Sequence, residues 1–135
     1  MNLQSKMKLN HMSFPTVDVT TEAKFFEEHF GARIEFVDAA TGSALLKHGE
    51  NDIVLEAMKD TVPWHRDFHF GFEFETRREV DALYEQLKRA GVKLETGVFN
   101  RMGRGSRFFG RTPGGVQFEI LTREDMESKW DANKK

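Results

Sequence analysis

Four residues of this chain have the types and the spacing to bind a metal ion. His11 and His69 each lie in a short segment of alternating polar and apolar residues, and Glu56 and Glu119 follow them in similar segments, 45 and 50 residues further on. A carboxylate inside a strand is costly to bury unless it is paired or bound to a metal. Two imidazoles with one or two carboxylates suit Ni, Zn, Mn, Co or Fe(II). The chain has no Cys, so a metal site in it would use nitrogen and oxygen ligands alone.

Repetition of the pattern favours this interpretation over its alternative. A single His in a strand is more often a hydrogen-bonded or surface residue than a ligand, and a strand Glu usually faces solvent. Here the His-then-Glu pair occurs twice. The two stretches of chain also contain similar strings, GARIE at 31–35 in the first and GVKLE at 91–95 in the second. Two stretches with the same motifs in the same order predict a duplicated structural unit. The equivalent placement of four polar residues in that repeat raises the odds of a shared metal site.

Each unit is expected to form a strand, a helix and then three strands. Residues 68–74 alternate Phe with other residues, so the Phe side chains share one face and His69 lies on the other. Thr76 and Glu79 form a capping box before an apolar-periodic helix that ends at Gly91. In the first unit Thr20 or Thr21 is expected to cap the helix, which ends at Gly31.

The remaining segments complete the predicted organisation. Further strands are expected at 33–38, 43–48 and 52–58 in the first unit, and at 92–98, 105–110 and 116–121 in the second. The predicted boundaries are a lead over 1–7, module one over 8–58, a linker over 59–66, module two over 67–122 and a tail over 123–135. The tail is expected to be a loose helix or a frayed end with Trp130 docked.

An arginine-rich segment follows the second helix. Arg101, Arg104, Arg107 and Arg111 alternate with glycines, and one interpretation is an anion clamp in which Arg104 and Arg107 bind a carboxylate or phosphate substrate. The alternative is a solvated turn. A dinucleotide fingerprint is excluded because Phe108 stands where its third glycine is required.

Composition limits the classes of function. The 135 residues suit one domain, and a net charge of −2, with 20 basic and 22 acidic residues, argues against a nucleic-acid binder. Neither a membrane-spanning run nor a signal peptide is recognisable, so a cytoplasmic protein without membrane partners is expected.

Residues 8–122 resemble the vicinal-oxygen-chelate superfamily, which includes glyoxalase I, bleomycin-resistance and fosfomycin-resistance proteins and extradiol dioxygenases. The resemblance rests on LNHM at 9–12, on the first helix through Phe30-Gly31, on HFGF at 69–72 and on the closing stretch PGGVQFEI at 113–120. Thr112 replaces the Asp that usually precedes this turn.

The resemblance implies an α+β fold in which two βαβββ modules form a curved mixed-sheet cup around a divalent metal ion. His11, His69 and Glu119 fall on the family's metal triad, and Glu56 on the fourth position used by glyoxalase I-like members. Glu119 or Glu56 would move the proton. Chains of this size are expected to form homodimers with metal sites at or near the subunit interface.

The implied activity is that of a metal-dependent lyase or isomerase of glyoxalase type. It would chelate a small substrate, anionic if the arginine-rich segment is a clamp, through two neighbouring oxygens and stabilise an enediolate-like intermediate. Without Glu56 as a ligand, the set would match an extradiol-type Fe(II) dioxygenase. Such dioxygenases usually add acid–base His and Tyr residues around the metal. The only tyrosine here, Tyr84, falls on the apolar stripe of a helix, which counts against that alternative. A metal-free protein that binds small molecules or antibiotics with the same fold is the third alternative.

Overall fold

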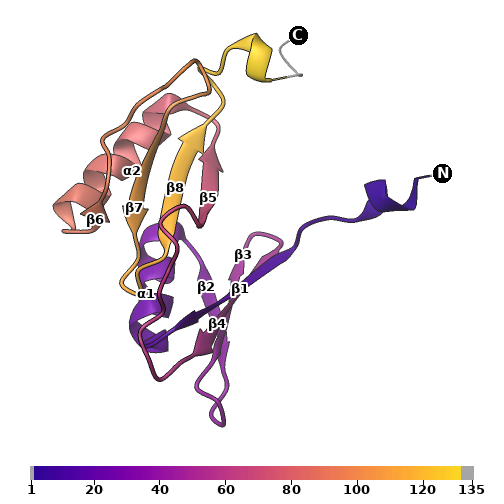
Figure 1. Cartoon of the computed structure of the whole chain (residues 1–135), viewed down its shortest axis with the longest axis vertical. Helices are drawn as coiled ribbons and strands as arrows, with labels where there is room; N and C mark the ends of the chain where they lie inside the picture. Colours follow the sequence, from indigo (N-terminus) through magenta and orange to yellow (C-terminus); the bar gives the residue numbers. More distant parts are fainter. Residues whose placement is uncertain (1, 132–135) are drawn as a thin grey trace. The chain divides into compact units, whose positions relative to one another are not determined.

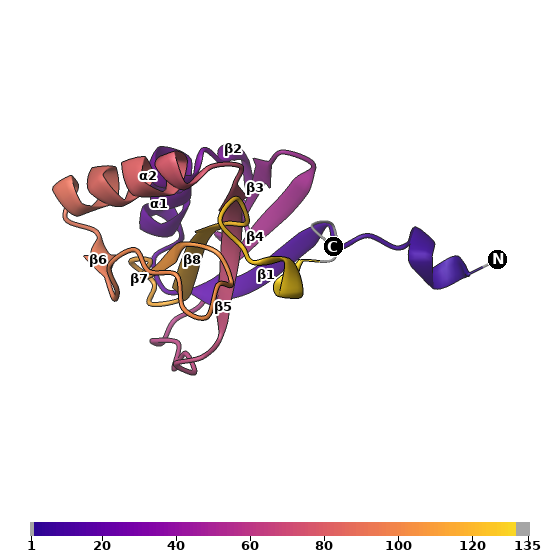
Figure 2. The ribbon, with the colours of Figure 1, turned by 90° about the horizontal axis from the view of Figure 1, so that it is seen from above.

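The chain folds into two compact units, Met1–Pro63 and Trp64–Lys135, in a computed structural model that describes residues 2–131. Each unit has one α-helix and one four-stranded mixed sheet in the order βαβββ (Figure 1). Each helix packs on strands of its own unit. Figure 2 shows the same ribbon from above. The α+β architecture predicted from the sequence is therefore confirmed.

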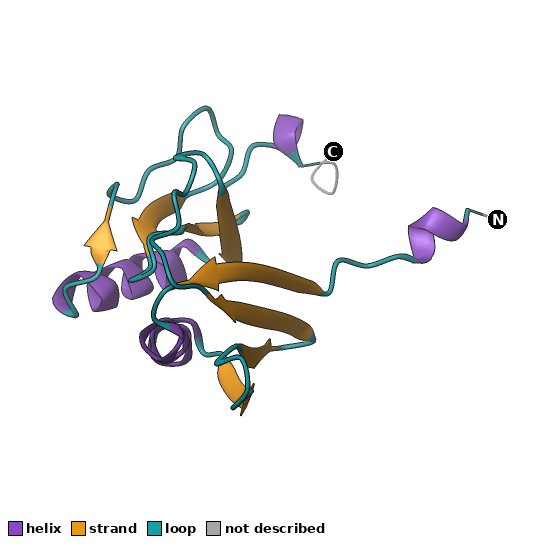
Figure 3. Cartoon of the chain, turned by 60° about the horizontal axis from the view of Figure 1, so that its bottom comes forward, coloured by secondary structure: helices purple, strands orange, loops and turns teal. Residues whose placement is uncertain are grey.

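The first unit begins with a 3₁₀ helix, η1 (Leu3–Lys6), which Figure 3 shows at the end of an extended lead. Its other elements are β1 (His11–Thr16), α1 (Val19–Phe30), β2 (Arg33–Val37), β3 (Ala44–His48) and β4 (Asn51–Ala57). The strand order is β1-β4-β3-β2, with β1 parallel to β4 and the other pairs antiparallel. Phe26 is fully buried, and its ring lies 5.8 Å from that of Phe14 and 5.1 Å from that of Phe30.

The start of α1 differs from the sequence prediction. Asp18, rather than Thr20 or Thr21, caps this helix by accepting a hydrogen bond from the Thr21 backbone N–H at 3.0 Å. The Thr21 hydroxyl also donates to Asp18, at 2.8 Å. Both hydrogen bonds lower the pKa of the Asp18 carboxyl, and the backbone bond contributes more than the hydroxyl bond. An ionised carboxylate at the positive end of the helix dipole outcompetes a hydroxyl as cap. Gly31 closes the helix in the left-handed conformation, as predicted.

The second unit contains β5 (His69–Phe74), α2 (Arg77–Arg89), β6 (Lys93–Leu94), β7 (Arg107–Arg111) and β8 (Gln117–Thr122). The strand order is β5-β8-β7-β6, with β5 parallel to β8. The predicted capping box is present, because the Thr76 hydroxyl accepts from the Glu79 N–H and the Glu79 carboxylate accepts from the Thr76 N–H. The core joins α2 to the sheet through four fully buried residues: Val80, Leu87, Phe108 and Phe118.

The segment between β6 and β7 is less regular than predicted. The strand expected over 92–98 is reduced to Lys93–Leu94, and the chain is then held to β7 by single contacts. The Thr96 hydroxyl accepts a hydrogen bond from the Phe109 N–H, and Phe99 forms an isolated bridge with Arg107. The Glu95 N–H still donates to the Phe109 carbonyl at 2.8 Å, but for the Phe109 N–H a side chain replaces the backbone partner that a continuous strand would supply.

The C-terminal segment docks on this connection. A 3₁₀ helix, η2 (Ser128–Trp130), places the Trp130 indole N–H 2.7 Å from the Met102 carbonyl oxygen, so the predicted docking of Trp130 is confirmed. The predicted tail continues over 132–135, outside the described residues. Among residues 2–131, no helix is both long enough and apolar enough to cross a membrane.

Candidate metal centre

The second unit places His69 and Glu119 on the same face of its sheet. His69 pairs with Gln117 and Gly71 pairs with Glu119, so the two side chains project from neighbouring parallel strands on the face opposite the buried Phe118. His69 Nε2 lies 3.4 Å from Glu119 Oε1. Two donors that share a metal ion at about 2.1 Å lie about 3.0–3.4 Å apart. The pair therefore fits two ligands of one metal ion.

The His69 ring is held in one orientation. Its Nδ1 lies 3.0 Å from the Asp67 carbonyl oxygen, which can only accept, so Nδ1 carries the hydrogen. The neutral ring then has its lone pair on Nε2, the atom that faces Glu119. Phe109 packs edge-on against the ring at 5.5 Å. A carbonyl partner on the second nitrogen is the usual support of a metal-binding imidazole.

Gly71 is part of this site and was not singled out from the sequence. It lies between His69 and Glu73 on β5, directly across from Glu119. A Cβ at this position would come within 3.2 Å of the Glu119 carbonyl oxygen and 3.5 Å of its Cβ. A glycine inside a strand marks such a close approach, so Gly71 keeps the space beside Glu119 open.

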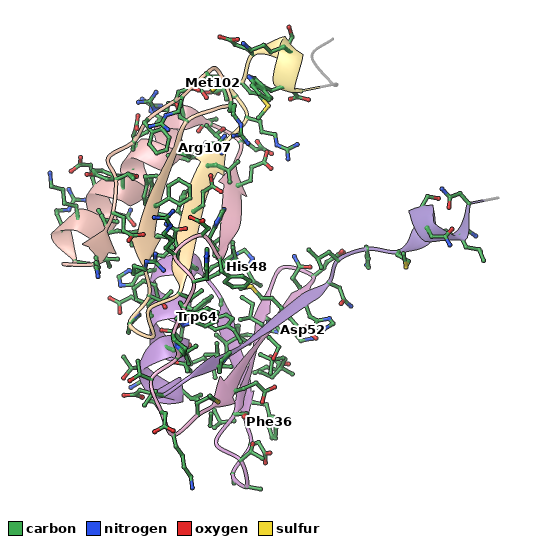
Figure 4. All side chains as sticks on the ribbon, viewed as in Figure 1. Phe36, His48, Asp52, Trp64, Met102 and Arg107 are labelled. Carbon is green, nitrogen blue, oxygen red and sulfur yellow. The ribbon has the colours of Figure 1, made fainter. Side chains whose placement is uncertain are left out.

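Arg107 occupies the other oxygen of Glu119. Its Nη1 donates to Oε2 at 2.9 Å, and the two side chains are 15% and 10% exposed. Figure 4 labels Arg107 on the second unit. Oε1 faces the imidazole while Oε2 is held by the guanidinium, so the carboxylate is oriented from both sides.

The other arginines of the predicted anion clamp also have partners within this unit. Arg111 Nε lies 3.1 Å from Glu95 Oε1. Burial alone would raise the pKa of Glu95, but hydrogen bonds from Gln117 and Arg111 outweigh it and lower that pKa. Arg104 lies over the Trp130 ring at 5.3 Å, and Arg101 lies over Phe99 at 5.9 Å.

In the first unit, His11 and Glu56 have separate surroundings. His11 is exposed at the start of β1, and its Nδ1 lies 2.8 Å from Asn10 Oδ1. Glu56 accepts hydrogen bonds from the hydroxyls of Ser13 at 3.2 Å and Ser43 at 3.3 Å. Within residues 2–131, no three His, Asp or Glu side chains are gathered closely enough to hold a metal ion without rearrangement.

Comparison with known proteins gives the family. A model of the Glyoxalase/Bleomycin resistance protein/Dioxygenase superfamily matches residues 8–120. The chain belongs to this superfamily. A search of curated proteins finds no significant match.

Solved structures of the superfamily share the fold at low sequence identity. A possible glyoxalase from Bacillus cereus is 24% identical, with a TM-score of 0.73, over 85% of this chain and 98% of its own. Lactoylglutathione lyase from Agrobacterium tumefaciens is 14% identical, with a TM-score of 0.72, over 87% and 94%. A variant of the fosfomycin resistance protein FosX from Listeria monocytogenes, solved with Mn(II) and 1S,2S-dihydroxypropylphosphonic acid, is 18% identical, with a TM-score of 0.75, over 85% and 91%.

The two modules of this superfamily member differ in the position of the second carboxylate. His11 and His69 each precede the N-cap of the following helix by seven residues, so they are equivalent. Glu119 pairs with the residue two after His69, whereas the residue two after His11, Ser13, pairs with Val54. Glu56 pairs with Pro15, four residues after His11, which is about 13 Å along a strand. The counterpart of Glu119 in module one is therefore Val54.

Proposed function

We propose that this protein is a divalent-metal-dependent enzyme of glyoxalase type, which acts on a small substrate through two neighbouring oxygen atoms. The observation that carries the proposal is the His69–Glu119 pair, with its donors 3.4 Å apart and its imidazole tautomer set by the Asp67 carbonyl. His11 is proposed as the third ligand, because it holds the position in module one that His69 holds in module two. A donor set of two imidazoles and one carboxylate suits Ni, Zn, Mn, Co and Fe(II).

A divalent ion bound by these residues would supply Lewis acidity to the substrate oxygens. The protein residues divide the remaining work. His69 presents Nε2 in a fixed orientation, and Arg107 holds Glu119 through Oε2. Oε1 is then the atom of Glu119 that can bind the ion or accept a proton from a substrate carbon. Gly71 leaves room beside that carboxylate.

Metal binding by the purified protein tests this proposal. The chelator-treated protein is titrated with Zn²⁺, Co²⁺, Mn²⁺ and Ni²⁺ by calorimetry, and the metal content of the untreated protein is measured by mass spectrometry. The wild type is expected to bind one ion per chain. His11→Ala, His69→Ala and Glu119→Gln should lose that ion, whereas His48→Ala, a control on β3, should keep it. Full metal content in the His69→Ala protein would contradict the proposal.

An Fe(II) dioxygenase is the second candidate, and one observation favours it. With Val54 at the fourth position, the ligand set is two His and one Glu, which matches the facial triad of non-haem iron oxygenases. The tyrosine that such an enzyme would recruit is absent from this face, because Tyr84 packs edge-on against the buried Phe108 at 5.2 Å. Oxygen consumption by the Fe(II)-loaded protein with a catechol, against turnover of an α-ketoaldehyde–thiol adduct by the Zn²⁺- or Ni²⁺-loaded protein, separates the two candidates.

A further inference from the structure

Arg107 has no part in the proposed ligand set, yet its one hydrogen bond to a side chain is to Glu119, a member of that set. Its Nη1 donates to Glu119 Oε2 at 2.9 Å, its Nε donates to the Gly105 carbonyl at 3.2 Å and its Nη2 donates to the Arg104 carbonyl. Two backbone carbonyls therefore fix the plane of the guanidinium. With the plane fixed in this way, Nη1 donates to one oxygen of the Glu119 carboxylate.

We propose that Arg107 is a positioning residue, which holds the Glu119 carboxylate so that Oε1 faces His69, and that it does not clamp an anionic substrate. This inference rests on the proposed function, because it assigns Arg107 a role toward the same metal ligand. A guanidinium that is 15% exposed and engaged at Nε, Nη1 and Nη2 presents little free surface to a substrate anion. The planar guanidinium fork donates to two carbonyls and to the carboxylate at once in a fixed geometry, which the single ammonium group of a lysine does not reproduce.

The local glycine explains why the carbonyls lie where Arg107 needs them. Gly105 has a φ of +97°, and a Cβ there would lie 2.2 Å from the Thr122 carbonyl oxygen. Asn100 Oδ1 accepts from the Gly105 N–H at 3.1 Å and fixes this turn further. The turn is thus built to direct the carbonyls of residues 104 and 105 at one side chain.

The chain supplies a matched control for Arg107 at the other end of β7, four residues further on. Arg111 is 14% exposed, pairs with one carboxylate, Glu95, and donates to two carbonyls, those of Gly115 at 3.1 Å and Arg66 at 3.3 Å. It has the same exposure and the same kind of partners as Arg107, but its carboxylate is not a proposed ligand. Loss of either arginine removes a comparable set of structural bonds.

The experiment compares Arg107→Met, Arg107→Lys and Arg111→Met with the wild type. Each chelator-treated protein is titrated with Zn²⁺ and Co²⁺ by calorimetry, the Co²⁺ absorption spectrum is recorded, and the midpoint of thermal unfolding without metal is measured. Both Met variants should show similar shifts in that midpoint. Only Arg107→Met should weaken metal binding, by about 10–100-fold, which is the usual cost of losing a partner of a metal ligand. Arg107→Lys should recover part of the affinity, because it keeps the charge and loses the fork.

The outcomes separate this inference from the proposed function. If the wild type binds metal and Arg107→Met binds it as tightly or more tightly, the positioning role is wrong and the metal site stands. Equal weakening in Arg107→Met and Arg111→Met would show a general structural effect and would also overturn the inference. If the wild type binds none of the ions, both proposals fail together.

Discussion

Glu119 and Glu56 are both strand carboxylates, and their surroundings assign them different roles. Glu119 is 8% exposed and lies between an imidazole and a guanidinium. Glu56 is exposed and is held by two neutral hydroxyls. A buried carboxylate needs charged partners, whereas an exposed one is satisfied by water and hydroxyls. We therefore propose Glu119, and not Glu56, as the carboxylate ligand.

Replacing each carboxylate by its amide tests that distinction. Glu119→Gln should lower the affinity for Zn²⁺ by at least about tenfold, because a carboxamide is a much weaker ligand than a carboxylate. Glu56→Gln should change the affinity by less than about threefold, because its offset of four residues places it away from His11. Calorimetric titration of the two proteins measures both values. A large loss in Glu56→Gln would restore Glu56 to the ligand set.

The sequence reveals the proposed ligands more readily than the residues that hold them in place. His69 and Glu119 can be found because a period of two and a repeated motif place them on one strand face. The role of Arg107 cannot be found in this way, because its bond to Glu119 depends on how β7 pairs with β8 and on two loop carbonyls. The offset of Glu56 likewise depends on the parallel register of β1 and β4.

Gly105 should tolerate a side chain poorly, because its φ is positive and its Cβ position faces a backbone carbonyl. In Gly105→Ala, the positive φ costs about 1–2 kcal/mol, and displacement of the Thr122 carbonyl adds about 1–3 kcal/mol. Gly91→Ala is the control, because its φ of +76° is also positive but a Cβ there meets nothing within 4 Å. Urea denaturation should show the larger loss of unfolding free energy for Gly105→Ala. Equal losses would mean that the close approach to Thr122 is relieved cheaply.

At the scale of elements, local signals predicted the helices well and the weak strand poorly. The capping box at Thr76 and the glycine at 31 act within one turn, so the sequence contains all of their partners. The strand at 92–98 was overestimated because a strand exists only where a neighbour pairs with it. Beyond Leu94 the regular pairing ends, because the Phe109 N–H is bonded by the Thr96 hydroxyl and not by a backbone carbonyl.

The segment after β8 is fastened to the sheet by a charged cluster that should make stability depend on pH. Asp125 accepts hydrogen bonds from the backbone N–H and the hydroxyl of the fully buried Ser106, and Arg77 Nη1 lies 3.7 Å from it. Burial raises the pKa of Asp125, but the Ser106 bonds and the Arg77 charge outweigh it and the net pKa is lowered. A lowered pKa in the folded state stabilises the protein above the unfolded value of about 3.9. This contribution is lost as the pH falls through the folded pKa.

Asp125→Asn should therefore destabilise the protein near neutral pH by about 1–3 kcal/mol, because the hydrogen bonds of a buried hydroxyl are weakened. The difference from the wild type should shrink as the pH falls below about 3.9, where the carboxyl is protonated first in the unfolded chain, and should vanish below the lower pKa of the folded protein. Denaturant unfolding at several pH values measures both effects. Asp60→Asn, at an exposed position between the modules, serves as control. A difference that stayed constant with pH would contradict this account.

At the scale of the whole molecule, the duplication explains both the success and the limit of sequence reasoning. The repeat predicts two βαβββ units correctly, because each unit has its own helix, caps and core. It overstates their identity, since Val54 rather than Glu56 corresponds to Glu119. A repeat preserves the fold of each copy through packing, while single polar positions in one copy are free to change. The pairing of the two proposed half-sites is the property that the repeat alone leaves open.

A mixture of two variants that each lack one proposed ligand shows whether the His11 half of a site and the His69–Glu119 half come from the same chain or from two chains. The resemblance of the sequence to its superfamily implies a homodimer with metal sites near the interface, and light scattering of the purified protein should give twice the mass of one chain. If each site takes His11 from one subunit and His69 with Glu119 from the other, a dimer of one His11→Ala chain and one His69→Ala chain keeps one intact site. Random mixing of a symmetric dimer then restores about a quarter of the wild-type metal content. Co-expression with two different affinity tags isolates the mixed dimer, which should bind one ion, whereas each variant alone binds none. A mixed dimer without metal would mean that each site is built within one chain, and a monomeric wild type would remove the premise.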